Sequence, residues 1–242
     1  MVTGMARYRE QSFEGVVGCG PAKIGPAAFD NCSFTDICFG LEGFPSPEIL
    51  DCHFEQSLFV QMNVDGIVLR RCSFDGVKTP GFNVARGLML DACILRGKIG
   101  SFGIQQARTP TGRQAAIAFY NSVHVALDIS EMRPTGGVGL TGVPGRLIRR
   151  DPKVQALVRV SEIVARFGSP VGVDSHEWCR SIEAVLGAGL SGILPEVHFA
   201  ARYGSVEDII LAARTGAPRA KWEEDVRFLR RCRDLGLLEL ED

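Results

Sequence analysis

The chain has 242 residues, of which 45% are hydrophobic and 23% are charged, a composition that suits a folded globular protein and excludes disorder and collagen. Its 27 Lys and Arg against 28 Asp and Glu give a net charge of −1, so no global field favours nucleic acid, an anionic membrane or a cationic partner. No apolar run reaches the roughly 18 residues of a membrane span, and Arg7, Arg9 and Glu10 lie where a signal peptide needs an apolar centre, so we expect a cytoplasmic protein.

Cysteines recur at a regular interval in the first part of the chain. Cys32, Cys52 and Cys72 are 20 residues apart, and Cys93 follows after 21. The first three stand in related strings, Asn-Cys-Ser-Phe, Asp-Cys-His-Phe and Arg-Cys-Ser-Phe. A small side chain followed two places later by a large apolar one, at a fixed period, indicates an internal repeat. We expect these thiols to be small buried apolar side chains.

The same segment has a finer period of five. Steps of five from Phe34 to Val84 meet ten apolar residues in eleven positions. Neither a helix nor a flat strand keeps every fifth side chain on one face. The period fits a coil with four short sides, each of which turns one apolar residue inward.

On these motifs, residues 31–104 resemble the pentapeptide-repeat proteins. The resemblance implies a right-handed quadrilateral β-helix in which a small residue and, two places on, Leu or Phe point inward. We therefore predict an α+β protein, with an N-terminal right-handed parallel β-helix over residues 1–150 and a C-terminal helical region over 151–242.

The predicted β-helix has irregular features near its end. Residues 105–118 read as an exposed loop insertion, because Pro110 and Gly112 are typical of loops. Period-two alternation predicts a strand over 123–129. Gly137, Gly139 and Gly142 have the spacing of a dinucleotide fingerprint, but no helix follows them, so we expect turns and no cofactor.

Residues 151–242 have the pattern of helices. Asp151 is a good N-cap with Pro152 behind it, and apolar residues line one face as far as Phe167. Further helices are predicted over 175–186, 195–203, 205–214 and 218–235.

Few residues suggest chemistry. His176 and Cys179 share a helix face and could supply a base and a thiol nucleophile, but no third group orients the base. An ordinary amphipathic helix is the favoured interpretation. The histidines and acids lack metal-ligand spacing, so no metal ion is expected.

These observations predict a non-catalytic protein-binding module or scaffold of solenoid type. We expect a protein partner, no membrane and no direct binding of nucleic acid, and a homodimer stays open. The candidate partner-binding residues are the apolar stripe of the last helix, Trp222, Val226, Leu229 and Leu235, with packing on the preceding helices as the other interpretation. Two alternatives remain: a DNA mimic acting on a type II topoisomerase, which the family resemblance implies, and a cysteine-dependent enzyme using Cys179 and His176.

Overall fold

The chain contains both helices and strands in this computed structural model, so it is an α+β protein. The structure describes residues 6–10, 12–14, 27–30, 33–35, 38–40, 48–51, 53–55, 58–60, 62–63, 67–76, 83–186, 198 and 208–241.

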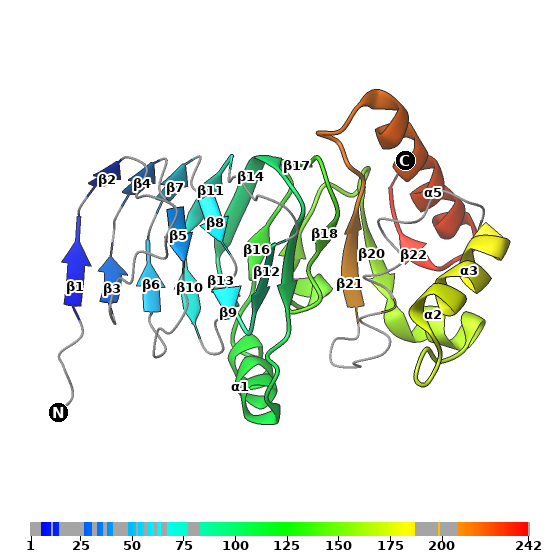
Figure 1. The fold of residues 1–242 in the computed structure, drawn as a ribbon, viewed down its shortest axis with the longest axis horizontal. Coiled ribbons are helices and arrows are strands. Elements are labelled where there is room, and N and C mark those ends of the chain that lie inside the picture. Colours follow the sequence, from blue (N-terminus) through cyan, green and yellow to red (C-terminus); the bar gives the residue numbers. More distant parts are fainter. Residues whose placement is uncertain are drawn as a thin grey trace.

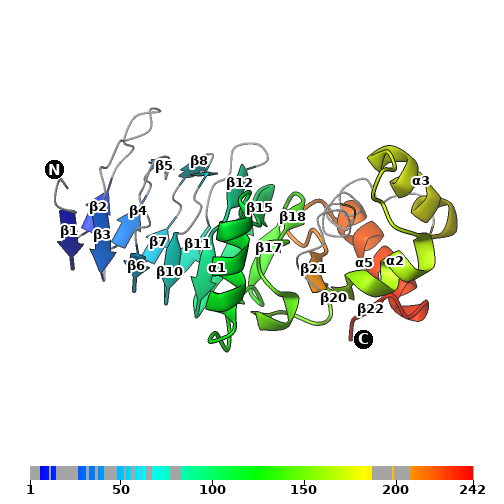
Figure 2. The same ribbon diagram turned by 90° about the horizontal axis from the view of Figure 1, so that it is seen from below.

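Parallel sheets of short strands form the first part of the molecule (Figures 1 and 2). Sheet A consists of β1 (Ala6–Arg9), β3 (Ala27–Asp30), β6 (Glu48–Leu50), β10 (Val68–Arg70) and β13 (Met89–Asp91). Sheet B consists of β2 (Ser12–Glu14), β4 (Ser33–Thr35), β7 (His53–Glu55), β11 (Ser73–Asp75), β14 (Cys93–Ile99), β16 (Leu127–Asp128) and β19 (Ile148–Arg149), and β17 (Met132–Pro134) also pairs with β14. A third sheet consists of β9 (Met62–Asn63), β12 (Asn83–Arg86), β15 (Phe102–Gln105) and β18 (Val138–Gly139). A fourth consists of β5 (Cys38–Gly40) and β8 (Leu58–Val60).

The register of these sheets follows the sequence repeat. Ser33 pairs with His53, and His53 with Ser73, which lies 20 residues further on. Arg70 pairs with Asp91, 21 residues later. Equivalent positions of successive repeats therefore stand beside one another across the sheets.

The apolar residues that follow the five-residue period are buried wherever the structure describes their side chains. In one repeat the positions concerned are Ile67, Leu69, Cys72 and Phe74, and in the next they are Leu88, Leu90, Cys93 and Leu95; all eight are buried in one apolar cluster, the first core. The predicted inward positions are confirmed for these two repeats. Apolar side chains at this spacing remove themselves from water when the chain turns repeatedly around them.

Left-handed residues turn the chain from sheet A into sheet B. Asp51, Arg71 and Ala92 have φ of 54°, 52° and 53°, a conformation that costs an L-residue about 1–2 kcal/mol. Stacking offsets this cost. The Asp51 N–H donates to the carbonyl of Arg70 at 3.0 Å, and the Arg71 N–H donates to that of Asp91 at 2.8 Å.

A helix stands where the next strand of sheet A is due. One more step of the repeat from β13 leads to Pro110, where α1 (Pro110–Tyr120) begins. The predicted loop over 105–118 is therefore wrong. Thr109 is the N-cap, its hydroxyl accepts the Gly112 N–H at 3.0 Å, and Pro110 takes the first turn, where its missing N–H is harmless.

The C-terminal region contains an antiparallel sheet as well as helices, which corrects the prediction of a purely helical region. The helix predicted from Asp151 to Phe167 is a strand, β20 (Gln155–Arg159), followed by α2 (Val160–Phe167). β20 pairs with β21 (Asp208–Ala212) on one side and with β22 (Leu238–Glu239) on the other. These long-range partners outweigh the local helical pattern.

The other predicted helices have mixed outcomes. The helix predicted over 205–214 is wrong, since Asp208–Ala212 form β21. All five residues of this strand are buried, whereas an amphipathic surface helix would expose one of its faces. The helix over 175–186 is confirmed as α3 (Ser175–Leu186), and that over 218–235 as α5 (Arg219–Asp234). The helix predicted over 195–203 lies outside the described residues except for His198. Of the strand predicted over 123–129, only β16 forms.

β21 joins two cores. Ile210 and Ala212 belong to the first core, whereas Ile209 and Leu211 belong to a second core with the helices. The C-terminal sheet thus closes the end of the parallel sheets with one face, and α2, α3 and α5 cover the other (Figure 1).

Candidate functional site

The four partner-binding residues predicted from the sequence lie within the second core. Leu229 and Val226 are 0% and 9% exposed, and Trp222 and Leu235 are partly buried against the same cluster. The predicted stripe exists, but it packs on the molecule itself, where α5 contacts α3 and β22. These side chains offer no exposed docking surface in this structure.

The predicted nucleophile and base have different surroundings. His176 is exposed in the first turn of α3, whereas Cys179 is half-buried and packs against the second core. Reactive thiols occupy electropositive, accessible settings, so this arrangement does not favour catalysis by Cys179.

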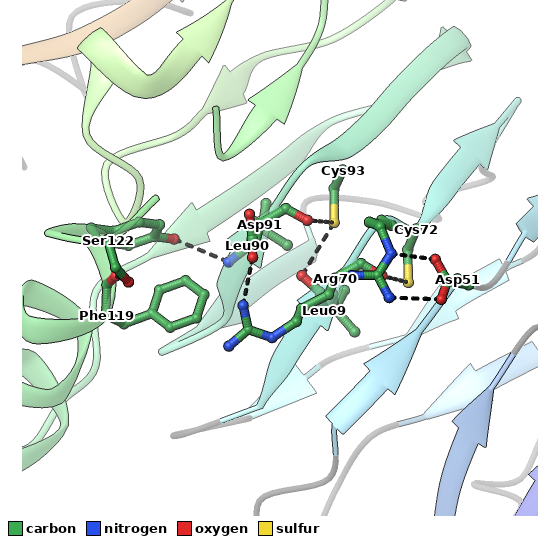
Figure 3. Close-up of polar contacts among 11 residues, drawn as sticks. Asp51, Leu69, Arg70, Cys72, Leu90, Asp91, Cys93, Phe119 and Ser122 are labelled. Atoms are coloured by element: carbon green, nitrogen blue, oxygen red, sulfur yellow. Dashed lines mark hydrogen bonds and ion pairs between the residues drawn. The ribbon is translucent and has the colours of Figure 1, made fainter. Parts of the chain in front are cut away.

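The described cysteines of the repeat are core residues. Cys72 and Cys93 are each 1% exposed. The Cys93 thiol donates to the Leu69 carbonyl at 3.3 Å, and the Cys72 thiol donates to that of Arg70 at 3.4 Å (Figure 3). A hydrogen bond from Cys72 lowers the pKa of Cys93, and burial opposes this shift. Cys32 and Cys52 lie outside the described residues.

Three carboxylates near the corners and strand ends are paired with arginines of neighbouring repeats. Asp51 accepts two hydrogen bonds from Arg71, at 2.5 and 2.7 Å, and this bonding lowers the pKa of Asp51. Arg70 pairs with Asp91 at 2.5 Å and Arg96 with Asp75 at 3.0 Å. The pairs neutralise this part of the surface and add little stability where they are exposed.

Helix α1 is fixed to sheet A through its last residues. The Arg70 guanidinium, already paired with Asp91, lies over the Phe119 ring, 5.2 Å from its centroid (Figure 3). The buried Tyr120 hydroxyl accepts the Leu90 N–H at 3.3 Å, and burial raises the pKa of that phenol. The C-terminal end of α1 is thereby held on the edge strand β13.

A cavity of about 300 Å³, which we call the α1 pocket, lies beside this helix. Its walls come from α1, the corner before β13, the end of β15 and the loop after β18, and they consist of Gly87, Leu88, Gln105, Gln106, Ala107, Arg113, Ala116, Ile117, Tyr120, Asn121, Gly142, Pro144 and Arg146. The volume is at the lower end of the range for ligand pockets. Ile117 is 49% exposed although it is apolar, so it marks the open side.

Two arginines give the α1 pocket its charge. Arg113 is held by the carbonyls of Ala107 and Arg108, at 3.3 and 2.8 Å from its Nη1. Arg146 is exposed, and its loop is fixed by the buried Asp208, whose carboxylate accepts the N–H groups of Gly145 and Arg146 at 2.8 and 3.2 Å. None of the lining residues is acidic.

A buried acceptor without a partner lies in the pocket wall. Gln105 is 8% exposed, and its Oε1 has no hydrogen-bond partner in the part of the chain that the structure describes. An unsatisfied buried acceptor costs about 1–3 kcal/mol.

The α1 pocket was not predicted from the sequence. Pro110 and Gly112 are typical of loops, so the local sequence does not predict α1, and Arg146 lies far from α1 in the sequence. The one available signal was the repeat itself, because a strand was due at Pro110 and the residues there do not suit one.

Among the described residues, no group of three or more His, Cys, Asp or Glu is placed to hold a metal ion. Within the same part of the chain, no helix has the length and apolar character needed to cross a membrane. No protein-family model, curated protein or solved structure matches the chain.

Proposed function

We propose that the chain is a non-catalytic protein-binding module, in which residues 1–150 form a right-handed β-helix of the pentapeptide-repeat type and residues 151–242 close its end. The parallel pairing of segments 20 or 21 residues apart supports this architecture. Parallel crossover connections are right-handed in about 98% of cases. The alternating burial of Ile67, Leu69, Cys72 and Phe74 fits the inward positions of such a coil.

The observation that carries the proposal is the outer column of sheet B. The in-register positions His53, Ser73, Ile94, Asp128 and Arg149 lie beside one another across five strands. His53 and Ser73 are joined by a hydrogen bond of 2.6 Å. Because strand pairing fixes the backbone of this column before a partner binds, the surface itself would lose little backbone entropy on binding.

An apolar side chain stands in this column. Ile94 is 43% exposed, next to positions that are polar. Val125, 40% exposed, belongs to the adjoining corner, where its carbonyl accepts the Ala92 N–H. An apolar centre with a polar rim is the common anatomy of a protein interface.

The experiment is site-specific photo-cross-linking in an extract of the native host. Benzoylphenylalanine in place of Ile94 should give a discrete protein adduct that excess wild-type protein competes away and excess Ile94→Asp protein does not. The matched control is the same probe in place of Val171, which is 66% exposed and lies in the turn before α3. Absence of an adduct at position 94, or the same adducts from both positions, would contradict the proposal.

The DNA-mimic alternative has a distinct outcome. It requires an acidic surface, whereas Asp51, Asp75 and Asp91 are each paired with an arginine. A type II topoisomerase in the Ile94 adduct would favour that alternative over a general scaffold.

A further inference from the structure

The α1 pocket combines cationic and apolar walls. Arg113 and Arg146 line it with no acidic residue beside them, and Leu88, Ala116 and Ile117 supply apolar surface. The Arg146 guanidinium has no hydrogen bond or ion pair within the described residues, whereas Asp208 fixes its backbone. A guanidinium beside an apolar cavity complements a ligand that carries an anionic group next to an apolar one.

We propose that the α1 pocket binds the C-terminal residue of a partner protein whose last side chain is apolar. One such residue carries both complementary groups: a carboxylate for Arg146 and Arg113, and an apolar side chain for Leu88 and Ile117. A carboxyl terminus is a recurring recognition element in protein complexes. The small volume suits a single side chain and its terminal carboxylate. This inference rests on the proposed protein-binding function and names the part of the partner that is recognised.

The test is calorimetric titration of the full chain with two peptides, acetyl-glycyl-glycyl-leucine as the free acid and the same peptide as its C-terminal amide. The free acid should bind about tenfold more tightly than the amide, because only the acid forms charge-assisted hydrogen bonds with the arginines. Arg146→Gln should abolish most of this preference.

Arg219→Gln is the matched control. Arg219 is the first residue of α5, its side chain is 85% exposed, and it pairs with Glu223 at 2.7 Å outside the pocket and outside the outer column of sheet B. This variant should keep the preference for the free acid, and circular dichroism should show both variants folded.

Three results would overturn the inference: equal affinity for acid and amide, a preference that survives Arg146→Gln, or no binding of either peptide. None of them affects the cross-linking experiment at Ile94, so the inference and the proposed function can fail separately. Binding that is lost equally in Arg219→Gln would also overturn it, because the pocket would then not be the site.

Discussion

Cys72 shows how closely the interior of the repeat is filled. It is 1% exposed, and its neighbours in the first core include Leu69, Phe74 and Cys93. A thiol at this position acts as a small apolar side chain with one weak donor. A charged group at this position would be buried among apolar side chains of the first core.

Replacement of Cys72 by aspartate should therefore lower the free energy of unfolding by more than about 4 kcal/mol, because a carboxyl group would be buried in an apolar core. Cys72→Ala, which leaves the site apolar, should lower it by only about 1 kcal/mol. Urea unfolding followed by far-ultraviolet circular dichroism measures both. Similar midpoints for the two variants would show that Cys72 is not enclosed.

Gln105 should respond in the opposite direction. Gln105→Met keeps a similar volume and removes the acceptor that lacks a partner, so we expect the free energy of unfolding to rise by about 1–3 kcal/mol. Gln106→Met is the control, since Gln106 is only half-buried, and it should change stability little. A lower melting temperature for Gln105→Met in calorimetry would mean that its amide makes a favourable contact.

Among the elements, α3 depends on one carboxylate ahead of its first turn. Asp174 accepts the N–H groups of His176 and Glu177 at 2.9 and 3.2 Å. The bond from Glu177, followed by that from His176, lowers the pKa of Asp174 from its usual value of 3.8. The charged form therefore favours the folded state.

Asp174→Ala should destabilise the protein at neutral pH, and the difference from wild type should shrink in acid. Because the folded-state pKa lies below 3.8, the stabilisation is complete above the unfolded-state pKa and is lost as the pH falls through the folded-state pKa. Urea unfolding at about pH 7 and about pH 3, monitored by tryptophan fluorescence, gives the two differences. An equal loss at both pH values would show that the charge of Asp174 has no role.

Elements with local causes could be predicted from the sequence. α3 has a capping carboxylate, Asp174, directly before it, and α5 lies between Pro218 and the left-handed Gly236; both helices carry an apolar face within their own segments, so their predicted positions agree with the structure. The burial of Cys72 and Cys93 followed from the repeat. Elements that depend on distant partners were missed. Val154, Leu157 and Val158 fit a helix face, but pairing with β21 and β22 makes the segment from Gln155 to Arg159 a strand.

The candidate site was missed for the same reason. The α1 pocket unites α1 with residues on either side of it in the sequence, from Gly87 to Arg146. Gly142 lies so close to Gln105 that a Cβ on it would be 2.6 Å from the Gln105 carbonyl oxygen. No local sequence pattern indicates this contact. Only the folded chain brings these residues to one cavity.

At the scale of the whole molecule, the two cores share β20 and β21. Leu157 packs against the first core, and Val158 belongs to the second. A buried ion pair joins α5 to the segment that follows β21: Asp225, 1% exposed, accepts bonds from the backbone and guanidinium of Arg214 at 2.6 to 2.8 Å.

Deletion from residue 218 removes α5, β22 and Asp225. The remaining second core would be open to water, so the truncated protein should be insoluble, or should bind a hydrophobic dye and lose its near-ultraviolet circular dichroism. A truncated chain that stays folded but changes its oligomeric state by light scattering would favour the other interpretation, in which the α5 stripe is an interface. A folded chain with unchanged association would contradict both.

Helix α1 has one more consequence, which concerns aggregation. A parallel sheet that ends on an exposed strand is a template for the strand of another molecule. At β13 the Leu90 N–H is already occupied by the Tyr120 hydroxyl, and Phe119 is seated over Arg70 on the neighbouring strand. Sheet A therefore ends at a helix, which cannot be extended by β-pairing. At this edge α1 hinders pairing with a strand of another molecule.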